Sequence, residues 1–192
     1  MDKLDIVKEE VEKIYTSKNP EADPWIYWGY PNHVLIVAKD AKELAKQHGA
    51  NVEFVVAGAL LHDIADAVMR RNKPNHEEES LKIASDILKK AEFSDEEIRT
   101  ITEDIIIPHS CHDIMPEIIE AKIVSTADSM AHLGTDFYIF IGWFPDKYLE
   151  GYDAYKDWAR EKIERDYHKK IFFDDVREKL KFRYEALKSL FA

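Results

Sequence analysis

The sequence predicts an all-α fold, and three observations lead to this prediction. Apolar residues recur at three- and four-residue intervals along much of the 192-residue chain, beginning with Leu4, Val7 and Val11. Few segments show the strict polar–apolar alternation of a half-buried strand. Breaks that suit helix ends, such as Pro20 and Gly49, separate the helical patterns.

The helical pattern divides into successive helices with short joints. Asn32 and Asn51 are suited to cap helix starts, and Ser94 with Glu97 has the spacing of a capping box. The helix that follows Asn51 is apolar nearly all round, so we expect it at the centre of the core. The expected helices cover about residues 4–15, 32–47, 51–64, 94–107, 117–133 and 155–192, with another that begins near residue 77.

An aromatic loop that contains proline is expected over residues 19–31, before the helix at Asn32. Two interpretations of this loop are open. The favoured one is that its rings pack against the core, and the other is that they stack on a nucleobase. The rings are those of Trp25, Tyr27, Trp28 and Tyr30.

Composition and charge exclude several classes of protein. With 45% hydrophobic residues, the chain is too apolar to be mainly disordered. The 27 Lys and Arg against 38 Asp and Glu give a net charge of −11, which argues against a duplex nucleic acid partner. This charge does not exclude a small phosphorylated substrate, because bound cations can reverse the local field.

Nothing in the sequence indicates a membrane or an oxidising compartment. The longest apolar runs, 54–61 and 137–144, are far shorter than the roughly 20 residues of a membrane-spanning helix. The N-terminus lacks the apolar region of a secretion signal. The single cysteine, Cys111, cannot form an internal disulfide. We therefore expect a cytoplasmic protein.

A few polar residues in apolar surroundings are candidates for chemistry. His62 and Asp63 end the apolar helix, where a histidine and a carboxylate need a partner. His33 projects from an expected helix start, and Asp128 lies in another apolar helix. Imidazole and carboxylate suit divalent ions such as Mn, Fe, Co, Ni or Zn. The alternative is that these groups are polar residues satisfied within the core.

These residues, in this order, resemble the H…HD…D signature of the HD superfamily of metal-dependent phosphohydrolases. The resemblance covers about residues 25–135 and rests on the stretches NHVLIVAKDAKELAKQHG, VAGALLHDIAD and IVSTADSM. It implies an HD-domain helical bundle. His76 and His109 match the additional histidines of members with binuclear sites, similar to the bacterial diadenosine tetraphosphate hydrolases of this superfamily.

The resemblance implies one or two divalent ions per chain (Mn, Fe, Co, Ni, Zn or Mg), with Asp63 as the carboxylate that bridges two ions. It also implies a hydrolase that uses metal-activated water on a small phosphorylated substrate, a nucleotide or dinucleotide. Two alternatives remain open: an HD-type di-iron oxygenase and a metal-binding regulatory module without turnover. The implied ligands are His33, His62, Asp63, His76, His109 and Asp128.

The chain departs from its relatives three residues after Asp63. Relatives place a lysine near the phosphate there, whereas this chain has Asp66, which we consider a catalytic candidate together with Asp63. The substrate contacts expected in place of that lysine, or beyond it, are Arg70, Arg71, Lys73, His112 and His132.

The C-terminal part of the chain differs in composition from the rest. Of the 22 aromatic residues, 15 follow Gly134. We divide the chain into an N-terminal helix and connection (1–24), an HD-domain core (25–135) and an aromatic-rich helical extension (136–192). An apolar stripe along 155–192 can dock on the core, cover the metal cleft or form a homodimer. Docking on the core is favoured, and a homodimer comes next.

Overall fold

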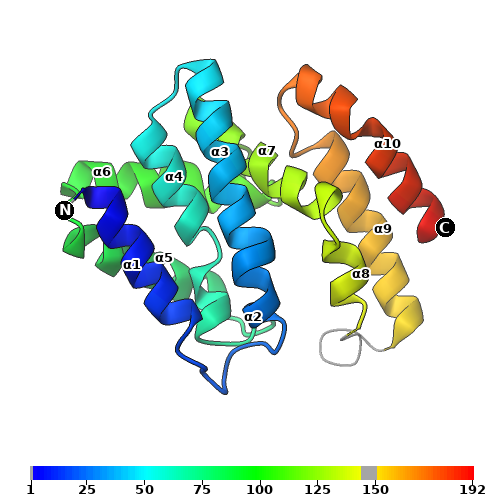
Figure 1. The fold of residues 1–192 in the computed structure, drawn as a ribbon, viewed down its shortest axis with the longest axis horizontal. Coiled ribbons are helices and arrows are strands. Elements are labelled where there is room, and N and C mark those ends of the chain that lie inside the picture. The colour runs from blue at the N-terminus through cyan, green and yellow to red at the C-terminus, as the bar shows by residue number, and fades with distance from the viewer. Residues whose placement is uncertain (1, 144–150) are drawn as a thin grey trace.

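The computed structural model describes residues 2–143 and 151–192, and within these ranges every regular element is helical (Figure 1). The predicted all-α fold is therefore confirmed. The α-helices are α1 Lys3–Tyr15, α2 Ile26–Gly29, α3 Leu35–His48, α4 Val52–Leu61, α5 His76–Lys90, α6 Asp95–Arg99, α7 Ile119–Gly134, α8 Phe137–Ile141, α9 Tyr152–His168 and α10 Asp174–Leu190. Two wide π-turns, η1 Tyr30–Val34 and η3 Thr100–Ile106, and two tight 3-10 turns, η2 Ile64–Ala67 and η4 Ile107–Ser110, complete the helical structure.

Helix α7 is the central element of the fold. It contacts α3, α4 and η3 in the N-terminal part of the chain, and it also contacts α8, α9 and α10 (Figure 1). Its side chains are therefore buried on almost every face, including the polar Ser125, Thr126 and Asp128. A carboxylate at the centre of such a helix needs polar partners from the surrounding elements.

Helix α4 is buried as the sequence predicts, and its start is capped as predicted. The Asn51 side chain accepts hydrogen bonds from the backbone N–H groups of Glu53 and Phe54, at 3.0 and 3.2 Å. Gly58 allows close packing on η3, because a Cβ atom there would lie 2.8 Å from Cγ2 of Ile105. This contact explains why a glycine is present inside an otherwise favourable helix.

Other helix ends predicted from the sequence are also confirmed. Gly49 ends α3 with a left-handed φ of 68°. Ser94 and Glu97 form the predicted capping box at the start of α6. Acidic residues occupy the first turn of α5 and lysines its last turn, which suits the helix dipole.

The predicted start of the helix at Asn32 is wrong. Helical structure begins earlier, at Ile26, and continues through the π-turn η1 into α3. The Asn32 side chain donates to the carbonyl oxygen of Trp28 at 2.9 Å, so it lies inside the helical segment. Pro31, which has no backbone N–H, lies near the start of η1, where the helix widens from α to π spacing. The predicted loop over 19–31 is therefore helical from residue 26.

Other predicted boundaries also shift. Helix α4 ends at Leu61, so His62 and Asp63 lie directly after its C-terminal end. The tight turn η2 follows them. The helix from Ser94 changes into the π-turn η3 at Thr100, and the helix expected over 117–133 covers 119–134. The single helical pattern over 155–192 divides into α9 and α10, with a break at residues 169–173.

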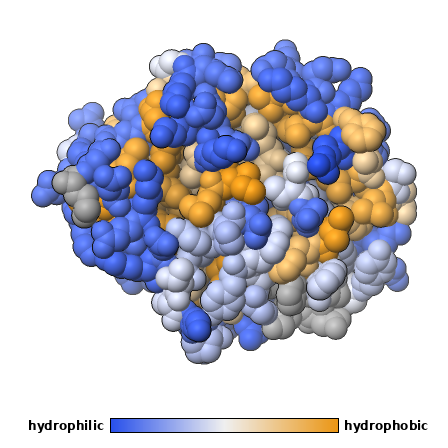
Figure 2. All heavy atoms as spheres, in the orientation of Figure 1, coloured by the Kyte–Doolittle hydropathy of each residue, from blue (hydrophilic) through white to orange (hydrophobic). Residues whose placement is uncertain are grey.

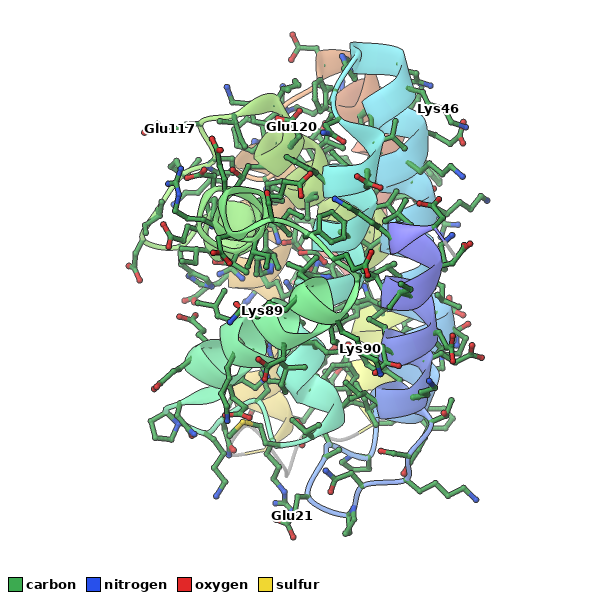
Figure 3. The ribbon with its side chains drawn as sticks, turned by 90° about the vertical axis from the view of Figure 1, so that its left-hand side faces the viewer. Glu21, Lys46, Lys89, Lys90, Glu117 and Glu120 are labelled. Carbon is green, nitrogen blue, oxygen red and sulfur yellow. The ribbon has the colours of Figure 1, made fainter. Side chains whose placement is uncertain are left out.

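The outer faces of the helices are polar. Figure 3 labels Lys89 and Lys90 at the end of α5, and Glu120 in the first turn of α7. The Lys90 ammonium lies 2.8 Å from a carboxylate oxygen of Glu10, which ties α5 to α1. Glu120 accepts a hydrogen bond from the backbone N–H of Asn51 and so ties α7 to α4. Figure 2 shows, on the face seen in Figure 1, hydrophobic patches among the hydrophilic residues. Within the described ranges, every helix is too short or too polar to cross a membrane.

Helices α9 and α10 of the C-terminal extension pack on α7, and α9 also contacts α8. The buried apolar side chains of this extension include Tyr155, Ile163, Tyr184 and Phe191. Tyr155 donates to the carbonyl oxygen of Tyr138 in α8, and Thr126 of α7 donates to the carbonyl oxygen of Lys170. These contacts bring the extension against the same helix that carries Asp128. The division of the chain into three parts and the homodimer stay predictions.

Candidate metal centre

His62 and Asp63 lie where the buried helix α4 ends. Because the helix brings its C-terminal end into the core, the His62 ring is only 2% exposed. The Nδ1 atom of His62 donates to the carbonyl oxygen of Ala59 at 2.8 Å. This hydrogen bond fixes the ring and leaves the Nε2 lone pair available for a metal ion.

His33 and Asp128 complete the first group of possible ligands. His33 lies in the π-turn η1, and such turns often occur at functional sites. Its Nε2 atom lies 3.2 Å from Oδ1 of Asp128, and the Nε2 atom of His62 lies 3.8 Å from the same oxygen. One ligand atom from each of these three residues lies within 4.8 Å of the others, which is the spacing expected around one ion.

His109 completes a second group with His62 and Asp63. It lies in η4 directly after Pro108, and its Nδ1 atom donates to the carbonyl oxygen of Ile106 at 2.6 Å. Its Nε2 atom lies 3.9 Å from Oδ1 of Asp63, whereas Oδ2 of Asp63 lies 3.6 Å from Nε2 of His62. The two oxygens of Asp63 therefore face different histidines, as a carboxylate shared between two ions would.

The protonation states fit a metal centre. Burial lowers the pKa of His33, and it lowers the pKa of His109 to about 4, so both rings are neutral at pH 7. Burial alone would raise the pKa of Asp63, but Arg71, His62 and His109 hold it well below its usual value. Oδ1 of Asp128 and Nε2 of His62 are buried without a hydrogen-bond partner. Neutral imidazoles, ionised carboxylates and buried unpartnered atoms are what a divalent ion requires.

His76 lies apart from both groups of ligands in the described structure. Its Nε2 atom lies 2.7 Å from Oδ1 of Asp66, and this carboxylate raises the pKa of His76 although burial opposes the rise. Oδ2 of Asp66 accepts a hydrogen bond from Arg71 at 2.7 Å, and the same Arg71 nitrogen lies 2.8 Å from Oδ2 of Asp63. Asp66 therefore joins His76 and Arg71 next to the centre. The role of His76 as a metal ligand stays a prediction.

A cavity of about 750 Å³ opens over the candidate centre. Four of the expected substrate contacts line it: Arg71, Lys73, His112 and His132. Arg70 is exposed and is not among the residues that line the cavity. Among the aromatic residues of 19–31, Trp25 lines the cavity, while the ring of Trp28 stacks on Phe140 and that of Tyr30 on Tyr15.

Three site residues of the C-terminal extension were missed by the sequence analysis. Lys170 is 2% exposed and its ammonium group contacts Oδ2 of Asp128. Oδ2 of Asp166 lies 3.0 Å from Nδ1 of His132, and Lys162 lies 3.5 Å from Oδ1 of Asp166. The signal was the four-residue spacing of Lys162 and Asp166, which places two charged groups on one face of α9 beside its apolar stripe, whereas Lys170 lies beyond the end of that helix.

Comparisons with known proteins define the class. Residues 30–133, more than half of the chain, match the model of the HD domain. The chain therefore belongs to the HD-domain family, which confirms the resemblance to metal-dependent phosphohydrolases seen in its motifs.

Two relatives agree with this assignment. A protein from Clostridium beijerinckii described as uncharacterized is 31% identical over 111 residues, which are 55% of this chain and 71% of that protein. A ribonuclease Y from Rubrobacter xylanophilus is 34% identical over 99 residues, or 52% of this chain. The match spans only 17% of that ribonuclease. No solved structure matches the chain at a significant level.

The two groups of ligands predict the metal content. Elemental analysis of protein loaded with Mn or Fe should approach two ions per chain, and His109→Ala should lower the content towards one, because His109 belongs to the second group alone. His76→Ala tests the remaining ligand prediction, since a ligand role would also lower the content. One ion per chain in the loaded wild-type protein would contradict the binuclear arrangement.

The buried histidines predict loss of stability in acid. Burial lowers the pKa of His109 to about 4 and that of His132 to about 3, and it also lowers the pKa of His33. Between about pH 6.5 and pH 4 the unfolded chain therefore binds protons that the folded chain does not. The free energy of unfolding should therefore decrease as the pH is lowered through this range. The decrease should reach up to about 1.4 kcal/mol per pH unit for each such histidine. His76, whose pKa is raised, contributes in the opposite direction.

Urea unfolding of the metal-free protein at pH 7.5 and pH 5 measures this effect. His109→Asn should make the pH dependence shallower, since one buried ring is removed. Equal free energies of unfolding at the two pH values would show that protonation of these buried rings does not destabilise the fold as expected.

Proposed function

We propose that this protein is a metal-dependent phosphohydrolase that acts on a small phosphorylated substrate, with a nucleotide or dinucleotide as the favoured class. The observation that supports this most is the pair of adjacent ligand groups around His62 and Asp63, which line a cavity large enough for a small molecule. Membership of the HD-domain family agrees with this chemistry.

The ligand side chains have defined roles in this proposal. His33, His62 and Asp128 would hold one ion, and Asp63 and His109 the other, because the single free lone pair of His62, on Nε2, can bind only one ion. Divalent ions at such a centre offset charge on phosphoryl oxygens and lower the pKa of water. The backbone carbonyls that accept from His62 and His109 fix the two rings in the orientation that coordination requires.

Arg71 is the proposed phosphate contact in place of the lysine that relatives carry. Its side chain lines the cavity and is 46% exposed, so it can turn towards a ligand. A guanidinium binds phosphate oxygens with two parallel hydrogen bonds. Both oxygens of Asp66 are engaged, one with Arg71 and one with His76. We therefore propose that Asp66 positions these two side chains next to the reacting group.

The kind of substrate is supported by charge and by one relative. The cavity contains cationic side chains although the whole chain carries −11, which favours an anionic small molecule. The relative named ribonuclease Y suggests phosphodiester chemistry, but it matches over a small part of its length. The net charge favours a nucleotide or dinucleotide over a long duplex.

A hydrolysis screen tests this proposal. Purified protein loaded in turn with Mn, Fe, Co, Ni, Zn or Mg is incubated with nucleotides, dinucleoside polyphosphates and cyclic dinucleotides, and the products are separated by chromatography. We expect metal-dependent hydrolysis of at least one compound, and its loss on addition of a chelator. Tight metal binding without turnover of any compound would reject the hydrolase and favour a metal-binding regulatory module.

A further inference from the structure

Helix α9 places two cationic side chains at the wall of the cavity, outside the part of the chain that matches the HD domain. Lys162 and Arg165 both line the cavity, and the family match ends at residue 133. They are three residues apart on one helix, so their side chains share a face. The neighbouring loop contributes His112 to the same wall.

The charge of Lys162 is incompletely compensated within the protein. The whole residue is 9% exposed, and its ammonium group lies 3.5 Å from the nearest carboxylate oxygen, Oδ1 of Asp166. Asp166 also accepts a hydrogen bond from Tyr138 at 2.6 Å and lies near His132. Burying a cation that shares its counter-ion in this way costs desolvation free energy. A further anion that approaches the ammonium group would offset this cost.

Arg165 has an unused hydrogen-bond donor at the same wall. Its Nε atom is buried and has no hydrogen-bond partner among the described residues. Burial together with the positive charges of Arg165, Lys162 and Lys170 lowers the pKa of His112, so its ring is a neutral group beside the two cations.

We propose that Lys162 and Arg165 form an anion subsite at the α9 wall of the cavity that binds a second phosphoryl group of the substrate. A phosphoryl group carries close to two negative charges at pH 7, which two cationic side chains match. Arg71 and Lys73 line the cavity as well, on the side of Asp63 and Asp66. The inference rests on the proposed function and specifies its substrate class as a small molecule with at least two phosphoryl groups.

Binding of inorganic phosphate to the full chain tests the subsite without turnover. Phosphate is titrated, with and without Mg²⁺, while the arginine Nε–H signals are followed by NMR, and the Arg165 signal is assigned by its absence in Arg165→Met. The Arg165 signal should shift and saturate. In calorimetry, Arg165→Met and Lys162→Met should each lower the affinity for phosphate at the subsite at least tenfold.

Lys169→Met is the matched control, because Lys169 lies one residue beyond α9, is exposed and does not line this cavity. It should leave the affinity unchanged. An unmoved Arg165 signal, or an equal loss of affinity in Lys169→Met, would overturn the subsite. Arg165→Met removes no hydrogen bond of Nε, so it should fold even where Lys162→Met does not.

Failure of the subsite and failure of the proposed function give different results. Phosphate binding at Arg165 together with no turnover in the hydrolysis screen would retain the subsite and reject the hydrolase. Turnover in the screen together with an unmoved Arg165 signal would retain the hydrolase and reject the subsite.

Discussion

Asp63→Ala should abolish hydrolysis while leaving the helical circular dichroism signal largely intact. Its two carboxylate oxygens lie near Nε2 of His62 and Nε2 of His109, so the Asp63 carboxylate connects the two groups of ligands. Removal of a single stabilising hydrogen-bond donor in an active site lowers turnover about 10²–10³-fold. We expect a larger loss of turnover in Asp63→Ala. The fold should persist, because Asp63 lies beyond the end of α4 and its side chain makes no helix cap.

Asp86→Ala is the control for this variant, since Asp86 is an exposed carboxylate on α5, away from the cavity. It removes the same charge and should retain full activity. The metal content of Asp63→Ala should also fall. Retention of most of the turnover in Asp63→Ala would show that the centre has been assigned to the wrong residues.

A chain cut after Pro145 should be insoluble or strongly destabilised. Pro145 itself lies outside the described residues, but the cut removes α9 and α10. The lost side chains include Tyr155, Ile163 and Phe191, which are almost fully buried. Burial of each such side chain contributes about 1.5–3 kcal/mol to the free energy of unfolding. A whole domain is stable by only about 5–15 kcal/mol, so the loss of several such side chains is comparable with the total.

The cut would also expose polar groups that the extension now covers. Asp128 would lose Lys170, and His132 would lose Asp166. Phe182→Ser serves as a control, because this α10 side chain is 81% exposed and should contribute little to stability. Thermal unfolding compares the variants. A soluble truncated chain with the thermal stability of the full chain would show the extension to be a peripheral appendage.

Local signals predicted those parts of the fold that depend on nearby residues. The Asn51 cap, the capping box of Ser94 and Glu97, and the end of α3 at Gly49 depend on a few adjacent residues and are confirmed. The predicted helix start at Asn32 was wrong, because helical structure begins at Ile26 and continues past Pro31 through a π-turn into α3. Wide turns of this kind have no clear signature in a single sequence.

The candidate site was predictable where it follows a motif and unpredictable where it depends on tertiary contacts. The order of His33, His62, Asp63 and Asp128 indicated a common centre, and the structure brings these side chains together. The pairing of His76 with Asp66 depends on how the chain turns after Asp63. The contact of Lys170 with Asp128 joins residues 42 positions apart, so local pattern could not reveal it.

Anomalous X-ray scattering from crystals of the Mn-loaded protein locates the metal ions and so tests the binuclear arrangement. We expect one anomalous peak beside His33, His62 and Asp128 and a second beside Asp63 and His109, where these side chains line the cavity. Strong peaks elsewhere on the molecule, with none at these two groups of side chains, would contradict this arrangement.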